Sequence, residues 1–112
     1  MVAGSSGGNA YQSISFGFEL ASAPTPHYVA SGAVPPAECP GTAANPIALP
    51  GHLCLYEWSQ FNASGFTFIG ADQVNAATRW GVALLLQSAS PSLNFYSRGT
   101  WVVTAPLGTN PG

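Results

Sequence analysis

The sequence predicts an all-β domain, an antiparallel β-sandwich or jelly roll of about six strands with one long proline-rich loop. Three observations support this fold class. Large apolar side chains alternate with small or polar ones in several segments, glycine and proline separate these segments, and none has the period of an amphipathic helix. Residues 71–78 are the one stretch that fits a helical turn, and a loop fits them equally well.

Two strands and a long connection are predicted in the first half of the chain. Residues 13–20 alternate between large apolar and small or polar side chains, which is typical of a half-buried strand. Prolines end this strand, and residues 27–30 form a short second one. Residues 31–51 contain five prolines, a density that forbids a helix or a central strand. We therefore expect this segment to be an ordered connection over the surface.

The second half of the chain holds four more predicted strands, at residues 52–58, 66–69, 79–88 and 95–105. The third of these is apolar on both of its alternating faces, which indicates a strand buried on both sides. Residues 11–106 are therefore expected to form one sandwich domain, between a flexible lead-in or linker at 1–10 and a flexible tail at 107–112.

The low charge is the most unusual feature of the composition. Only 5% of the residues are Asp, Glu, Lys or Arg, against about 25% in an ordinary soluble domain. Arg79 and Arg98 are the two cations, and the net charge is −2, which excludes nucleic-acid binding and a polybasic membrane patch. The longest apolar run is far too short to insert into a membrane. The surface is therefore either neutral and polar or buried against copies of the same chain.

The two cysteines, Cys39 and Cys54, enclose a segment rich in proline, glycine and alanine. A disulfide between them would hold a segment with little regular structure and contribute about 3 kcal/mol. Two buried free thiols are the alternative. With His52 these cysteines give three metal ligands without a fourth, so no metal site is predicted.

No residue pattern in the chain indicates catalysis or a cofactor. The sequence has neither a Gly-x-Ser-x-Gly nucleophile motif nor a glycine-rich phosphate loop, and its few carboxylates show no diagnostic spacing. We expect the protein not to be an enzyme. The scarce charges instead predict a structural ion pair between Glu57 and either Arg79 or Arg98, because a buried charge needs a partner.

One cluster suggests a binding surface. Aromatic rings beside side-chain amides are typical of carbohydrate platforms, although such rings more often belong to a core or an interface. The residues of this candidate platform are Trp58, Gln60, Phe61 and Asn62.

Several blocks of the sequence resemble the C-terminal globular domains of secreted, collagen-like bacterial proteins of actinobacterial type. The most specific blocks are Cys39-Pro40-Gly41 and Gly51-His52-Leu53-Cys54, supported by residues 15–28, 79–81 and 97–106. The resemblance implies a trimeric jelly-roll head that registers three chains of a collagen triple helix. The chain departs from that pattern because it contains no Gly-X-Y repeat.

Together these observations predict a non-catalytic, extracellular or cell-surface structural domain that forms a homotrimer. The alternative is a carbohydrate- or receptor-binding module at the tip of a fibre, which would bind a glycan or a cell-surface ligand through the Trp58 platform. A trimeric head could perform both roles.

Overall fold

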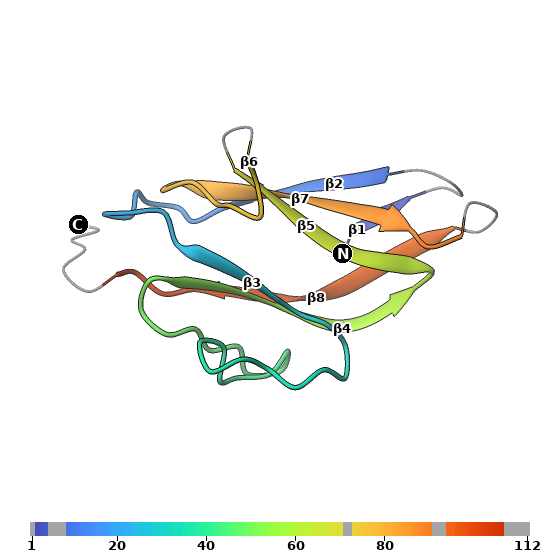
Figure 1. The fold of residues 1–112 in the computed structure, drawn as a ribbon, viewed down its shortest axis with the longest axis horizontal. Helices are drawn as coiled ribbons and strands as arrows, with labels where there is room; N and C mark the ends of the chain where they lie inside the picture. Colours follow the sequence, from blue (N-terminus) through green and yellow to red (C-terminus); the bar gives the residue numbers. More distant parts are fainter. Residues whose placement is uncertain (1, 5–8, 71–72, 91–93, 107–112) are drawn as a thin grey trace.

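The computed structural model describes residues 2–4, 9–70, 73–90 and 94–106. In these residues the chain forms two four-stranded sheets packed face to face, and no helix (Figure 1). The predicted all-β sandwich is confirmed. The strands are β1 (Val2–Gly4), β2 (Asn9–Ser15), β3 (Thr25–Val29), β4 (His52–Phe61), β5 (Ala63–Gly70), β6 (Gln73–Val74), β7 (Gly81–Ser88) and β8 (Phe95–Val103).

Three pairs of consecutive strands each place one strand in the first sheet and the other strand in the second sheet. The first sheet has the order β1-β8-β4-β3, and the second has the order β2-β7-β5-β6. The pairs β1/β2, β8/β7 and β4/β5 therefore occupy equivalent positions in the two layers, and neighbours among them are antiparallel. Asn62, with a φ of 53°, carries the chain from β4 into β5. This left-handed conformation is one that Asn adopts more readily than most residues.

The structure differs from the sequence-based expectation at five places. β6 is a strand within the stretch predicted to be a helical turn or a loop. β7 is fully buried on one face only, because its outward residues Ala83 and Leu85 are half-buried. β3 and β4 pair in parallel, which is feasible because the long connection between them supplies the required crossover. β1 and the start of β2 lie within residues 1–10, which the sequence predicts to be a lead-in; β1 gains its ladder from β8. The first predicted strand, expected to extend to residue 20, corresponds to β2, which ends at Ser15. The predicted tail at 107–112 lies outside the described residues.

The main core lies between the two sheets. The alternation in β7 places its even-numbered side chains inward, where they meet inward-facing residues of β2, β4 and β5. The buried members of this core are Ile14, Phe16, Leu20, Leu53, Leu55, Phe68, Val82 and Leu84. A second group, Ala10, Leu86 and Phe95, continues it toward the other end of the sandwich.

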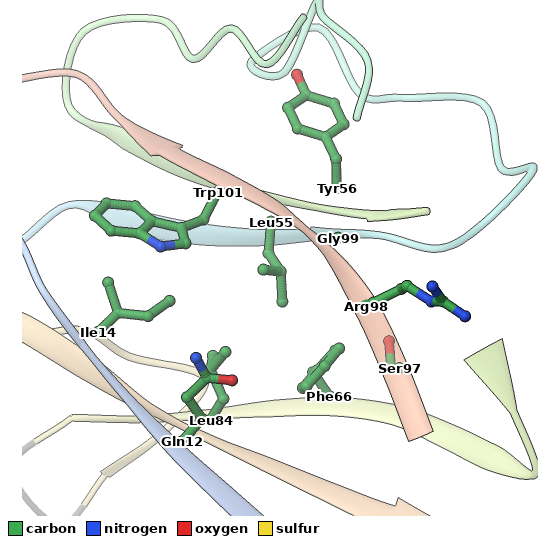
Figure 2. A pocket seen from close by; sticks show the side chains of 10 residues that line it. All are labelled: Gln12, Ile14, Leu55, Tyr56, Phe66, Leu84, Ser97, Arg98, Gly99 and Trp101. Carbon is green, nitrogen blue, oxygen red and sulfur yellow. The ribbon is translucent and has the colours of Figure 1, made fainter. Parts of the chain in front are cut away.

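A smaller core lies on the outer side of β4, under the proline-rich connection (Figure 1). Five consecutive residues of β4, from Leu53 to Glu57, are buried. Leu55 points between the sheets, whereas Tyr56 points the opposite way, toward the connection (Figure 2). The connection therefore acts as a third layer that covers what would otherwise be an exposed face of the sheet.

Side chains from the sheet anchor this third layer by its backbone. The Tyr56 hydroxyl donates to the carbonyl of Ile47 at 2.6 Å and accepts from the Gly41 amide at 2.9 Å. Thr100 and Thr104 donate to the carbonyls of Ala43 and Ala48. These bonds satisfy polar backbone groups that regular secondary structure does not pair.

The disulfide joins Cys39 in the connection to Cys54 in β4, and both residues are fully buried. The predicted bridge is confirmed. It ties the third layer to the sheet covalently, beside the Tyr56 anchor.

A Cys39→Ala/Cys54→Ala double variant should lose about 3 kcal/mol of stability, because its unfolded chain is no longer closed over a separation of 15 residues. For a domain of this size the melting temperature should fall by more than about 10 °C. Thermal denaturation with and without reductant measures the change. Reductant should destabilise the wild type and leave the double variant unaffected; an equal melting temperature for both proteins would contradict the role given to the bridge.

Candidate functional site

The four residues of the predicted platform have different roles in the structure. Trp58 is 70% exposed and Phe61 is 48% exposed, both on β4. The Gln60 side chain accepts a hydrogen bond from the Ala63 amide. The Asn62 amide group bonds the backbone of Ser90, which follows β7, and of Asn94, which precedes β8. Of the four predicted residues, two present rings to solvent and two have side-chain bonds to nearby backbone.

Trp58 stands out from the sheet because β4 has an irregular register at this residue. Glu57 pairs with Gly99 and Ser59 with Arg98, which leaves Trp58 as the extra residue of a bulge. Any Cβ at Gly99 would collide with the Tyr56 carbonyl oxygen, so this close approach requires glycine. Beside Trp58 lies an apolar pocket of about 380 Å³, also lined by Thr42, Ala43, Ala44 and Thr100.

Next to Trp58, two further aromatic side chains, Phe61 of β4 and Tyr96 of β8, lie together on the outer face of the first sheet. Phe61 stacks on Tyr96 with ring centroids 6.2 Å apart, and the Arg98 guanidinium lies 5.3 Å from the Tyr96 centroid. Tyr96 was not among the predicted platform residues. Its alternation with buried Phe95 and Ser97 in β8 is the signal that could have identified it as outward-facing.

Glu57 lies in a buried hydrogen-bond network rather than in an ion pair with an arginine. One carboxylate oxygen accepts from the Ser31 amide at 3.1 Å, and the other accepts from the Ser97 hydroxyl. Tyr28 lies close to the same carboxylate: burial first, and then hydrogen bonding and charge from Glu57, raise the pKa of Tyr28. Two donors therefore stabilise a carboxylate that is only 7% exposed.

The two arginines have other partners. Arg79 forms an ion pair with Glu19 at 3.5 Å, and its Nε donates to the carbonyl of Leu20. Arg98 stacks on Tyr96 instead, because β8 directs both of these side chains away from the sandwich interior. The predicted pairing of Glu57 with Arg79 or Arg98 is thus replaced by hydroxyl and amide donors, which the sequence gives no means of identifying.

Two histidines meet across the parallel pair of β3 and β4. His27 Nε2 lies 2.8 Å from His52 Nδ1, and the ring centroids are 5.0 Å apart. Burial and the nearby His52 lower the pKa of His27, with a smaller opposing effect from Glu38. The pair links the two strands at the end where their pairing begins.

The described residues contain no group of three or more His, Cys, Asp or Glu side chains arranged to hold a metal ion. In the same residues, no helix has the length and apolar character needed to cross a membrane. Between the sheets, a gap of about 50 Å³ lined by Leu55, Leu84 and Trp101 (Figure 2) is large enough only for water.

The outer face of the second sheet is uncharged. None of the residues of β2, β5, β6 and β7 is Asp, Glu, Lys or Arg. Strand register places seven outward side chains beside one another, and a shallow depression of about 380 Å³ lies at one end next to Trp80. We call this surface the uncharged face; its members are Tyr11, Ser13, Thr67, Ile69, Val74, Ala83 and Leu85.

Comparison of the chain with protein-family models, with curated proteins and with solved structures finds no match. The resemblance to collagen-associated head domains therefore stays a prediction. The functional argument depends on the geometry of the surfaces described above.

A Ser97→Ala variant should lose about 1–3 kcal/mol of stability, because the buried Glu57 carboxylate loses one of its donors. Chemical denaturation measures the difference. Ser59→Ala, a change on the neighbouring strand at a less buried position, serves as the control and should stay within about 0.5 kcal/mol of the wild type. Equal losses in the two variants would show that the Glu57 network contributes nothing specific.

The lowered pKa of His27 makes stability depend on pH with a definite sign. The unfolded state binds a proton at its ordinary pKa of 6.5, whereas the folded state resists protonation until lower pH. The free energy of unfolding should therefore decrease as pH falls below 6.5 and level off below the lowered pKa. Denaturation midpoints measured across this range should fall less steeply in a His27→Asn variant; an identical slope would remove His27 as the cause.

Proposed function

We propose that this protein is a non-catalytic structural domain that assembles with copies of itself through the uncharged face. The observation that carries this proposal is the complete lack of charge on β2, β5, β6 and β7. Charged side chains keep most monomeric surfaces soluble, and they are depleted at the centre of interfaces. Tyr11 and Val74, each 66% exposed, and Trp80, 59% exposed, are large apolar side chains that a partner would cover.

The edge strand β2 supports the same proposal. β2 lies at the edge of its sheet and has seven residues with neither lysine nor proline. Edges of this kind are open to pairing unless something covers them. By contrast, β3 at the edge of the first sheet carries Pro26, which blocks further pairing. The unprotected edge and the uncharged face belong to the same sheet.

The state that we propose is a trimer outside the cell. The trimer follows from the resemblance to collagen-associated heads, and the disulfide is compatible with the oxidising conditions found there. In a ring of three copies each copy would contact its two neighbours through two different surfaces, and the uncharged face and the adjoining edge of β2 would supply them.

Recognition of a receptor or a glycan by the exposed Trp58 is the second candidate function. The observation that favours it is the apolar pocket beside a bulged tryptophan that is 70% exposed. This surface belongs to the first sheet, so it would remain accessible in an assembly built on the uncharged face.

A Tyr11→Lys variant should dissociate the assembly, because it places a charge on the uncharged face, at its edge strand β2. An exposed strand position tolerates this change within about 0.5 kcal/mol, so the monomer should stay folded. Light scattering behind a sizing column measures the mass of each protein across a dilution series. Ala37→Lys, at an exposed position in the proline-rich connection, is the charge-matched control and should assemble as the wild type does. A wild-type protein that is monomeric at every concentration would overturn the proposal.

A further inference from the structure

A polar pocket of about 260 Å³ opens on the side of the sandwich where β3, β4 and β5 lie near one another. Its lining includes Tyr28 from β3, Ser31 just beyond that strand, and Glu57 and Gln60 from β4. Ser64 and Gly65 of β5 complete it. This pocket is separate from the apolar pocket beside Trp58, with which it shares no lining residue.

The Glu57 carboxylate gives the pocket a hydrogen-bond acceptor with unoccupied acceptor positions. A carboxylate offers about four acceptor positions, and two are occupied, by the Ser31 amide and the Ser97 hydroxyl. No cation pairs with Glu57 within the described residues, where the ion pair is the one between Arg79 and Glu19. A hydrogen-bond donor from a ligand would complete the coordination of this buried charge.

The other lining groups add complementary hydrogen-bonding capacity. Gln60 uses its carbonyl oxygen to accept from the Ala63 amide, which leaves its Nε2 without a hydrogen bond among the described residues. The Ser64 hydroxyl donates to the carbonyl of Gln87, so its oxygen can still accept. The pocket thus combines acceptors, a donor and the ring of Tyr28 within a small volume.

This combination discriminates between classes of small ligand. A simple cation could use Glu57 but would repel the Gln60 Nε2 donor, and an anion would be repelled by Glu57. A neutral molecule with adjacent hydroxyl groups both donates and accepts, and so satisfies every lining group. The volume is below the roughly 300–1,000 Å³ typical of sites for drug-sized ligands, which suits one ring rather than a chain of them.

We propose that the pocket lined by Tyr28, Glu57, Gln60 and Ser64 binds a single neutral sugar ring, with Glu57 accepting from a sugar hydroxyl and Gln60 donating to one. This function is additional to self-assembly. The pocket shares no residue with the uncharged face, so binding does not require the assembled state.

The test uses the full chain, isotopically labelled, and a panel of methyl glycosides of glucose, galactose, mannose and N-acetylglucosamine. Amide chemical shifts recorded during each titration should move at Ser31, Ser64 and Gly65 with at least one of these sugars. Gln60→Ala and Ser64→Ala should each weaken binding about tenfold, the effect of losing one hydrogen bond of about 1.4 kcal/mol. Gln73→Ala, at an exposed glutamine of β6, is the matched control and should bind normally.

Each remaining outcome decides the proposal. No shift change with any sugar of the panel overturns it. Shift changes confined to Trp58 and Thr100 overturn it as well, and assign binding to the apolar pocket instead. The Tyr11→Lys variant separates this proposal from the assembly function, because its monomer should bind the same sugar with the same affinity. Glu57→Gln keeps the shape of the side chain but removes the charge, and should weaken binding while the melting temperature is followed to confirm folding.

Discussion

The structure depends on covering both sides of β4. Five consecutive buried residues make this strand a member of two cores, one between the sheets and one under the proline-rich connection. The connection has no strand or helix of its own, so its place on the sheet depends on the disulfide, on hydrogen bonds from Tyr56 and two threonines, and on the apolar contacts of the smaller core. Once covered, β4 can place the Glu57 carboxylate inside the protein, at the floor of the polar pocket.

The two sheets have divided roles. The first sheet carries the covering connection and the bulged tryptophan, and the second offers a plain uncharged surface with an open edge. The polar pocket lies where β3 and β4 of the first sheet come near β5 of the second. Several of the few charged side chains of the protein have identifiable partners. Glu57 has hydroxyl and amide donors, Arg79 has Glu19, and Arg98 has the Tyr96 ring. Each of these charged groups therefore has a partner within the chain, and the strands of the second sheet contain no charged residue.

The alternation of side chains was sufficient to predict the class of fold and the course of most strands, because burial on one face imposes a period of two. The disulfide was predicted from the two cysteines and the proline-rich segment between them. Alternation was insufficient where a side chain or a strand has a partner that is distant in sequence. The partners of Glu57 are 26 and 40 residues away, and a hydroxyl or amide partner has no signature in the chain. The parallel pairing of β3 with β4 and the small ladder of β1 with β8 were missed for the same reason. At the candidate platform, residue types identified exposed rings but could not reveal that the Asn62 amide group is bonded to the backbone of Ser90.

The pairing of β1 with β8 has a consequence for how the protein folds during its synthesis. Val2 finds its ladder partner only at Ser97, and β2 finds its partner in β7. During synthesis the N-terminal strands therefore cannot pair until nearly the whole domain has been made. Folding dominated by such distant contacts is slow, and it leaves apolar strands exposed to aggregation for longer. Expression at reduced temperature, under conditions that permit disulfide formation, should therefore favour recovery of the native domain.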